Sequence, residues 1–178
     1  MKKGSLILAA LTVLASNMSF AKVDICVFDL LGKSGESYKL LEEWQLVSKQ
    51  WGTEVQLLAY QDEAKVDQDF KAGKCDGLFM TSMRARAYNK FAGSIDAIGG
   101  VPSNDIAMKA ISYVLDQRNA KRLVSTIGKD KFEVAGIVQI GTAYIFIRDR
   151  AINKIEQVKD KKFAVLHYDY AQKVMVNR

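Results

Sequence analysis

Residues 69–82, which read DFKAGKCDGLFMTS, decide the fold class of this chain. The stretch begins as the last turns of a helix and stops at Gly73, because glycine adopts a positive φ at a helix C-terminus without a steric penalty. The apolar run 77–80 is typical of a parallel strand covered on both faces. Thr81 and Ser82 then place two hydroxyls at the carboxyl end of that strand, where open α/β sheets bind their ligands.

Two strand–helix units precede this stretch. Residues 23–28 and 54–60 are rich in β-branched and aromatic side chains, which indicates strands. Residues 62–71 are predicted as a short helix. Between the strands, apolar residues recur at spacings of three and four, which predicts a helix with one apolar face in the core: Tyr38, Leu41, Trp44, Val47 and Trp51. The order β-α-β-α-β predicts an α/β fold with a parallel sheet and right-handed crossovers.

The remainder of the chain predicts one complete α/β lobe and the beginning of another. We expect a helix over 83–91, a long helix capped by Ser103 or Asn104, and strands over 132–139 and 142–147. The spacing of Ile152, Ile155 and Val158 predicts a further helix. A strand over 161–168 and a helix that begins at 169–172 are expected after it. One strand and one helix cannot bury a second core.

Residues 1–21 have the pattern of a cleaved signal peptide. Lys2 and Lys3 precede an apolar run over 6–15, and a small-x-small site ends at Ala21, directly before Lys22. The apolar run is shorter than the roughly 20 residues that span a bilayer. An uncleaved anchor is the alternative. Cleavage would give a mature chain from Lys22 that is located in the periplasm.

Charge and cysteine content limit the possible functions. The formal net charge is +6, but the basic residues lack aromatic interleaving, so they indicate solvated surface rather than a nucleic-acid interface. With a single histidine, His167, a metal site or a thiol–imidazole site has little support, and we expect no cofactor. Cys26 and Cys75, the only cysteines, form either a disulfide or two buried thiols.

Three motifs carry a family resemblance: FKAGKCDGLFMTS at 70–82, TAYIFIRD at 142–149 and INKIEQVKDKKFAVLHYDYAQ at 152–172. Together with the leader they resemble type II periplasmic solute-binding proteins, in particular the receptors of TRAP transporters. The leader and core also resemble exported proteins described as RND-type efflux components linked to aminoglycoside resistance. The resemblance implies a signal peptide at 1–21, a first lobe with hinge strands at 22–147, and the start of an incomplete second lobe at 148–178, as in a truncated receptor.

The resemblance also suggests where a ligand binds. TRAP receptors hold a substrate carboxylate with an arginine in the second lobe, but the matching position here falls near Ala164, so the clamp is missing. A ligand with hydroxyl or amine donors fits better. Arg84 and Arg86 would favour an anion if the helix predicted over 83–91 faces the ligand; otherwise they are solvated. The candidate ligand-binding residues are Asp29, Ser34, Thr81, Ser82, Arg84, Asp169, Tyr170 and Gln172.

Ligand capture without chemistry is therefore the expected function. Two lobes would close about a hinge on a small polar solute and deliver it to a membrane transporter. The alternative is an exported accessory protein of a multidrug or aminoglycoside efflux system that acts by protein–protein interaction. An enzyme is not expected, because the chain shows no nucleophile elbow, zinc motif or paired-carboxylate signature. The protein is expected to be a monomer.

Overall fold

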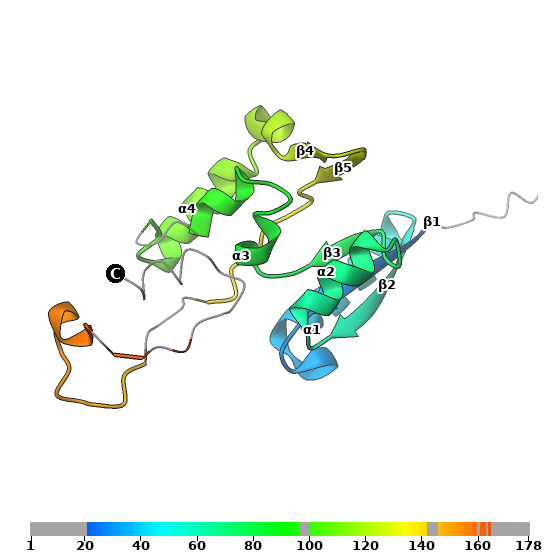
Figure 1. Ribbon diagram of the computed structural model, residues 1–178. Coiled ribbons are helices and arrows are strands. Elements are labelled where there is room, and N and C mark those ends of the chain that lie inside the picture. The colour runs from blue at the N-terminus through cyan, green and yellow to red at the C-terminus, as the bar shows by residue number, and fades with distance from the viewer. Residues whose placement is uncertain (1–20, 97–99, 142–145, 160, 163, 165–178) are drawn as a thin grey trace, which may run out of the picture.

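The computed structural model describes residues 21–96, 100–141, 146–159, 161, 162 and 164. A parallel sheet with helices on both faces comes first, and a helix and a β-hairpin follow (Figure 1). The elements are β1 (Ala21–Phe28), η1 (Gly32–Ser34), α1 (Glu36–Gln50), β2 (Thr53–Tyr60), α2 (Glu63–Lys71), β3 (Gly77–Phe79), α3 (Ser82–Ala85), η2 (Ala92–Asp96), α4 (Asn104–Val114), η3 (Gln117–Arg122), β4 (Val124–Ile127), β5 (Asp130–Glu133) and η4 (Ile155–Val158), where η denotes a 3-10 helix.

The sheet has three parallel strands in the order β2-β1-β3. In the central strand, Cys26 lies opposite Leu58 on one side and Leu78 on the other. Parallel strands are joined by crossover connections. Here α1 connects β1 to β2, and α2 connects β2 to β3 on the other side of β1. The predicted α/β class with a parallel sheet is confirmed.

Each face of the sheet has its own apolar cluster, because successive side chains of a strand point to opposite faces. Val27, Val55 and Leu57 form one cluster with Tyr38 of α1. Cys26 forms the other with Val66 of α2 and with Cys75. The two helices therefore cover opposite faces, and the core lies on both sides of β1.

A disulfide joins Cys26 to Cys75, with the two Cα atoms 5.8 Å apart. Both side chains are buried. The segment before β3 is also tied to β1 by hydrogen bonds, because the Asp76 N–H donates to the Asp24 carbonyl at 2.8 Å and the Asp24 N–H donates to the Asp76 carboxylate at 2.8 Å. Of the two alternatives that the sequence left open, the structure contains the disulfide.

A cap at Asp62, which the sequence analysis did not identify, adds to the two helix-end signals that it predicted, Gly73 after α2 and Ser103 before α4. Gly73 follows α2 with φ +71°, the left-handed conformation that favours glycine. Asp62 caps α2 by accepting from the Ala64 N–H, and Ser103 caps α4 by accepting from the Ile106 N–H. These signals act over a few residues, so they do not depend on the rest of the fold.

The prediction that both tryptophans lie in the core is wrong. Tyr38 of α1 is buried, but Trp44 is 47% exposed and Trp51, directly after the helix, is 82% exposed. An α-helix has 3.6 residues per turn, so each step of three residues turns the side-chain direction by roughly 60°. Residues at 38, 41, 44 and 47 therefore drift around the helix. The end of this series points away from the sheet and, together with Leu40, forms an exposed apolar stripe, which we call the α1 stripe: Leu40, Trp44, Val47 and Trp51.

The second half also differs from the sequence predictions. The helix expected over 83–91 is only α3, followed by turns. Of the strand expected over 132–139, only residues 132 and 133 are in a strand, at the end of β5. β4 and β5 form an antiparallel hairpin over 124–133, with Gly128 at φ +64° in a two-residue loop. Within the described residues after 150, the only helical segment is the 3-10 turn η4 (Ile155–Val158).

Several predicted features lie outside the described residues. They are residues 1–20 of the leader, residues 142–145 of the expected hinge strand, and most of the strand and helix expected after residue 160. Within the described residues, no helix combines the length and the apolar character needed to cross a membrane.

Candidate functional site at the carboxyl edge of the sheet

The loops after β1 and β3 leave the sheet at the same edge. Val27 lies opposite Phe79 in the parallel ladder, so the chain reaches Asp29 and Thr81 from neighbouring positions. Five of the eight predicted site residues are in these two loops or directly after them: Asp29, Ser34, Thr81, Ser82 and Arg84. The carboxyl edge of a parallel sheet is the usual place for a ligand.

Asp29 organises the first loop from a buried position. Its carboxylate accepts hydrogen bonds from the backbone N–H groups of Leu31 at 2.9 Å, Ser37 at 3.0 Å and Tyr38 at 3.3 Å. The first N–H groups of a helix have no partner within the helix, and a carboxylate there also interacts favourably with the helix dipole. Asp29 thus caps α1, and its carboxylate is already satisfied by backbone donors.

Thr81 is held by a carboxylate that the sequence analysis did not identify. Glu63, at the first turn of α2, is only 4% exposed. Its Oε1 accepts from the backbone N–H and from the hydroxyl of Thr81, each at 2.6 Å. No local motif indicates this contact, because the two residues are 18 positions apart.

Arg84 lies between two carboxylates. Its Nε is 3.6 Å from Glu63 Oε2, and its Nη1 is 3.9 Å from Asp67 Oδ2. Asp67 also accepts from Lys71 Nζ at 2.8 Å and from the Tyr88 hydroxyl. Burial raises the pKa of Asp67, but the hydrogen bonds from Lys71 and Tyr88 outweigh it and hold that pKa below its ordinary value. Asp67 is thus ionised, and the charge of Arg84 is compensated within the protein.

The hydroxyls of Ser34 and Ser82 are the remaining polar groups of the predicted site. Ser34 is exposed at the end of η1, and Ser82 is half-buried at the first position of α3. Within the described part of the chain, neither hydroxyl makes a hydrogen bond. Asp169, Tyr170 and Gln172 lie outside the described residues.

This edge is suited to hydrogen bonding rather than to chemistry. Two hydroxyls are accessible, while the buried carboxylates are engaged by backbone and arginine donors. No group of three or more His, Cys, Asp and Glu side chains is placed to hold a metal ion within the described residues.

Comparison with known proteins places the chain in a family. The family described as "Solute-binding protein AdeT 1/2" matches residues 42–178, which is most of the sequence. This chain belongs to that family. The match includes the hairpin and the loop that contributes Thr81, Ser82 and Arg84 to the carboxyl edge, whereas Asp29 and Ser34 lie before the matched residues.

A curated relative supports the assignment. This solute-binding protein is 39% identical over 150 residues to "Probable solute-binding protein AdeT1" of Acinetobacter baumannii, an alignment that covers 84% of the present chain and 48% of the relative. The chain thus spans about half the length of that relative. No solved structure matches the chain. Family membership indicates a binding function rather than catalysis.

Proposed function

We propose that this chain is an exported solute-binding protein that captures a small polar solute at the carboxyl edge of its sheet and passes it to a membrane transporter. One observation carries the proposal: the Ser34 and Ser82 hydroxyls lie at this edge, and their hydrogen-bonding capacity is unused within the described residues. Membership of a solute-binding family supports the role.

The charges around the edge favour a neutral or amine-bearing solute. Arg84 is compensated by Glu63 and Asp67, and Asp29 adds a further carboxylate behind the first loop. A bound anion would have to compete with these groups for Arg84, whereas hydroxyl or amine donors would meet serine oxygens and a mildly negative surrounding. We therefore infer a ligand with several hydroxyl or amine groups, such as a polyol, a polyamine or an amino sugar.

The architecture is compatible with the first lobe of a type II, TRAP-receptor-like protein. Residues 22–147 would form that lobe, and residues 148–178 would begin the second, which would contribute Asp169, Tyr170 and Gln172 from the opposite side of the cleft. Closure would then be driven by contacts that exist only in the closed state. A leader at 1–21 would direct the protein to the periplasm, and N-terminal sequencing after expression in a Gram-negative host should find Lys22 first.

A ligand screen by thermal unfolding tests the proposal on the 178-residue chain expressed with its own leader. The panel contains polyols, polyamines, aminoglycosides, amino acids and organic acids. A ligand that binds only the native state raises the unfolding midpoint in a saturable way. Ser82→Ala should weaken this shift, and Thr53→Ala, at the amino end of β2, should leave it unchanged. The proposal fails if no compound acts, or if both variants respond alike.

The α1 stripe favours a second candidate, an exported accessory protein of an efflux system that acts through protein–protein contacts. Trp51 is 82% exposed, and large exposed apolar patches mark interaction sites. Photo-crosslinking from position 51 in native membranes, with position 109 on α4 as the control site, would detect such a partner. A single partner captured from position 51 alone, together with a negative ligand screen, would favour this candidate.

A further inference from the structure

The side of α1 that faces the sheet is held there by polar groups. The Tyr38 hydroxyl donates to the Leu57 carbonyl at 3.3 Å. Gln45 donates from Nε2 to the Val55 carbonyl, and Ser48, three residues further along the same side of the helix, is buried. These contacts fix the rotation of α1 on β2, so the α1 stripe cannot turn inward and bury its apolar side chains.

The α1 stripe has the spacing of a seam between paired helices. Its members, Leu40, Trp44, Val47 and Trp51, follow one another at intervals of four, three and four residues. Apolar residues at these intervals occupy the a and d positions of a heptad, along which two helices pack side by side. The Trp51 N–H donates to the Ser48 carbonyl at 3.0 Å, which holds the last member in place after the helix. At 1.5 Å per residue, the seam is roughly 16 Å long.

An antiparallel pairing of two copies of this seam avoids conflicts of size and of charge. It sets each tryptophan of one copy beside the smaller Val47 or Leu40 side chain of the other. Glu43 and Gln50 border the seam on its solvent side. In the antiparallel arrangement Glu43 of one copy faces Gln50 of the other, so no like charges meet along this border.

The exposed area of the stripe is sufficient for a weak dimer. Trp44 is 47% exposed and Trp51 is 82% exposed, so together they leave on the order of 300 Å² in solvent, given about 250 Å² for a whole tryptophan. With Leu40 and Val47 included, two copies would remove roughly 900–1,000 Å² from water, which is near the lower limit of specific interfaces. We expect a dissociation constant of about 10–100 µM. In unfolding experiments at low micromolar concentration the chain is then mostly monomeric.

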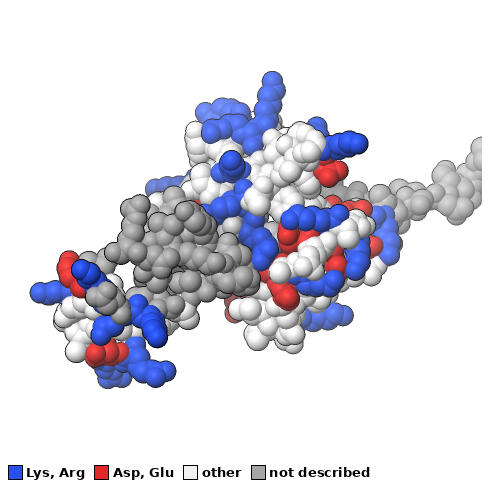
Figure 2. Space-filling model, viewed as in Figure 1, with Lys and Arg blue, Asp and Glu red and all other residues white. Residues whose placement is uncertain are grey.

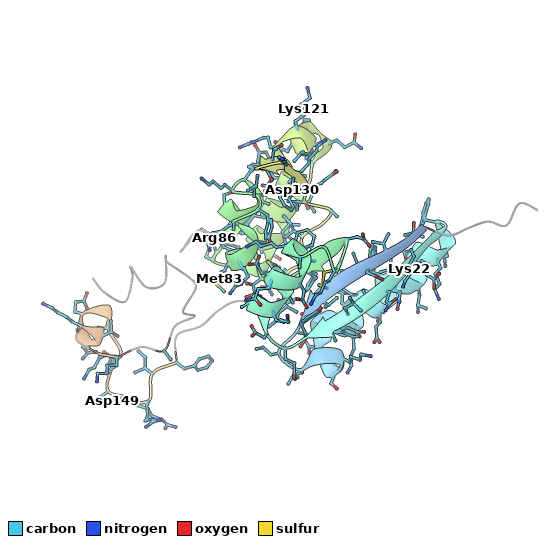
Figure 3. All side chains as sticks on the ribbon, turned by 45° about the vertical axis from the view of Figure 1, so that its right-hand side comes forward. Lys22, Met83, Arg86, Lys121, Asp130 and Asp149 are labelled. Carbon is cyan, nitrogen blue, oxygen red and sulfur yellow. A yellow bond between two sulfur atoms is a disulfide. The ribbon has the colours of Figure 1, made fainter. Side chains whose placement is uncertain are left out.

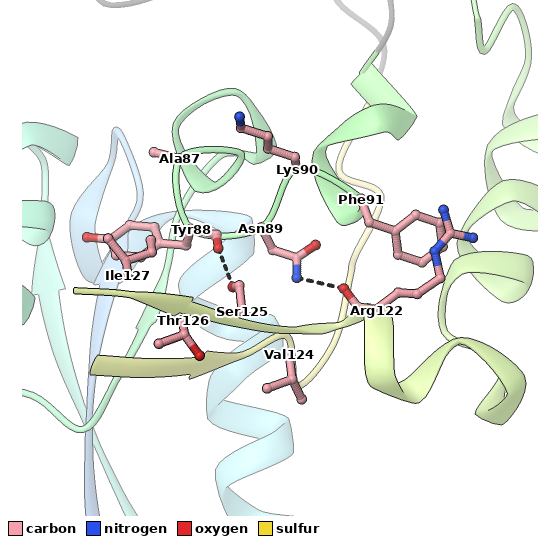
Figure 4. Close-up of a pocket in the computed structure, with 10 residues that line it drawn as sticks. All are labelled: Ala87, Tyr88, Asn89, Lys90, Phe91, Arg122, Val124, Ser125, Thr126 and Ile127. Carbon is pink, nitrogen blue, oxygen red and sulfur yellow. Dashed lines mark hydrogen bonds between the residues drawn. The ribbon is translucent and has the colours of Figure 1, made fainter. Parts of the chain in front are cut away.

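The hollow between the turn after α3 and the hairpin is a weaker candidate for a binding surface. Residues 87–91 and 122–127 line it. The Arg122 guanidinium lies over the Phe91 ring, 3.6 Å from the ring centroid, whereas the Lys90 ammonium lies at a separate end of the hollow (Figure 4). Its charged groups therefore do not converge on one ligand.

A lipid surface fits the α1 stripe less well than a second copy does. The helix carries three glutamates and two lysines: Glu36, Glu42, Glu43, Lys39 and Lys49. Helices that lie on anionic bilayers are instead rich in Lys and Arg on their polar face. Figure 2 shows Lys and Arg side chains over the end of the molecule formed by η3 and the hairpin. The charge beside the stripe thus disfavours an anionic bilayer.

We propose that the α1 stripe is the contact surface of a homodimer, in which the α1 helices of two copies pack antiparallel along the seam. Both copies use the same surface, so the association closes at two chains. The stripe contains neither Ser34 nor Ser82, and the inference is therefore independent of the solute proposed for the carboxyl edge. It replaces the expected monomer with a monomer–dimer equilibrium.

Sedimentation velocity and tryptophan fluorescence of the 178-residue chain, expressed with its own leader, test the proposal together. The weight-average mass should double as the concentration rises from about 5 to about 500 µM, across the expected dissociation constant. Both tryptophans of the chain belong to the stripe, so their emission should shift to shorter wavelength over the same range. A dimer formed through another surface would leave the emission unchanged.

Two adjacent residues of α1 provide a matched pair of variants. Val47 belongs to the stripe, whereas Leu46 is 66% exposed and faces another side, because successive helical residues are about 100° apart. Val47→Glu should weaken dimerisation by about tenfold or more, since it places carboxylates in an apolar seam. Leu46→Glu should have no effect, and neither should Lys121→Glu at the tip of the molecule in Figure 3. Leu40→Glu is a second stripe variant in case Val47→Glu disturbs the fold.

The proposal is overturned if the chain stays monomeric over the whole range, if it dimerises without a shift in emission, or if both stripe variants dimerise as well as Leu46→Glu does. It is also overturned if phosphatidylglycerol vesicles shift the emission while the chain is monomeric. Photo-crosslinking from position 51 should capture a second copy of this chain, and a different protein captured in its place would overturn the proposal. Ser82→Ala should leave dimerisation unchanged, so the dimer and the carboxyl edge can fail separately.

Discussion

The carboxylate of Asp29 lies directly against the Cα atom of Gly35, so that any Cβ at position 35 would overlap it. The backbone of Gly35 has φ −78° and ψ 159°, which other residues adopt without strain. Glycine is needed here for space and not for conformational freedom. The space allows Asp29 to reach past the loop and cap α1.

This relationship predicts a non-additive pair of substitutions. Asp29→Ala should lower the free energy of unfolding by about 1–2 kcal/mol through loss of the cap. Gly35→Ala should cost a similar amount, because the new methyl group displaces the same carboxylate. In the Asp29→Ala background, Gly35→Ala should change stability by no more than about 0.5 kcal/mol. Chemical denaturation of the four proteins measures the cycle, and strict additivity would contradict the structure.

The contact between Thr81 and Glu63 predicts a stability effect at the carboxyl edge. Thr81→Val keeps the shape of the side chain but removes the hydroxyl that donates to Glu63 Oε1. Because Glu63 is buried, we expect a loss of about 1–2 kcal/mol. Thr126→Val on β4 is the matched control, since Thr126 is exposed and should change stability by less than about 0.5 kcal/mol. Equal effects in the two denaturation curves would argue against the Glu63 contact.

The exposure of the α1 stripe predicts that Trp51 can be replaced with little loss of stability. Trp51→Ala should alter the free energy of unfolding by about 0.5 kcal/mol or less, because the side chain is mostly in solvent. A tryptophan in the core would cost about 3–5 kcal/mol. The two values are far enough apart for a single pair of urea titrations to separate them. Tyr38→Ala, at a buried position of the same helix, is the control that should be strongly destabilised.

Reduction of the disulfide should destabilise the sheet. Cys26 and Cys75 are 49 residues apart, and opening such a loop typically costs about 2–4 kcal/mol. Urea unfolding with and without dithiothreitol measures the difference. The double variant Cys26→Ala, Cys75→Ala should be less stable than the oxidised protein and should not respond to the reductant. A midpoint that is equal under both conditions in the unmodified chain would show that the bond contributes nothing.

The lowered pKa of Asp69 predicts that its contribution to the free energy of unfolding is lost in a defined acid range. Hydrogen bonds from Lys65 and Lys74 lower the pKa of its carboxyl from 3.8 to about 2, against the opposing effect of burial. A lowered pKa in the folded state means that the contribution is complete above about pH 4 and is lost as pH falls through about 2. The stability gap between the unmodified chain and Asp69→Asn should therefore narrow between these pH values.

The control for this experiment is Asp130→Asn, an exposed carboxylate of the hairpin without an ion pair within the described residues. If the gap between Asp69→Asn and the unmodified chain persists unchanged at pH 2, the two lysine contacts do not lower the pKa as described.

Much of the first sixty described residues could be predicted from the sequence, because the signals are local. Gly73 ends α2, Asp62 and Ser103 cap their helices, and strand composition identifies β1 and β2. The hairpin was missed although Gly128 marks its turn, since the apolar residues after it read as a longer strand. A short alternating segment with a glycine in a two-residue loop was the available signal.

The surroundings of the candidate site residues could be predicted only in part from the sequence. Asp29, Thr81 and Arg84 lie at the carboxyl edge of the sheet, as the sequence predicts, because parallel strands bring their carboxyl ends together. Contacts between residues far apart in the sequence could not be predicted: Glu63 accepts hydrogen bonds from Thr81, 18 positions away, and Asn89 donates to the Arg122 carbonyl, 33 positions away. Such contacts depend on how α2, α3 and the hairpin are packed.

The sequence by itself determined the order of strands and helices along the first half of the chain and the residues at which several helices begin or end, because propensities, caps and glycine turns act within a few residues of the chain. Only the tertiary structure decided that Cys26 bonds to Cys75, that α1 exposes its tryptophans, and that Glu63 holds Thr81. Those features depend on the rotation and spacing of packed elements, which the energy of the whole core selects and no single segment encodes.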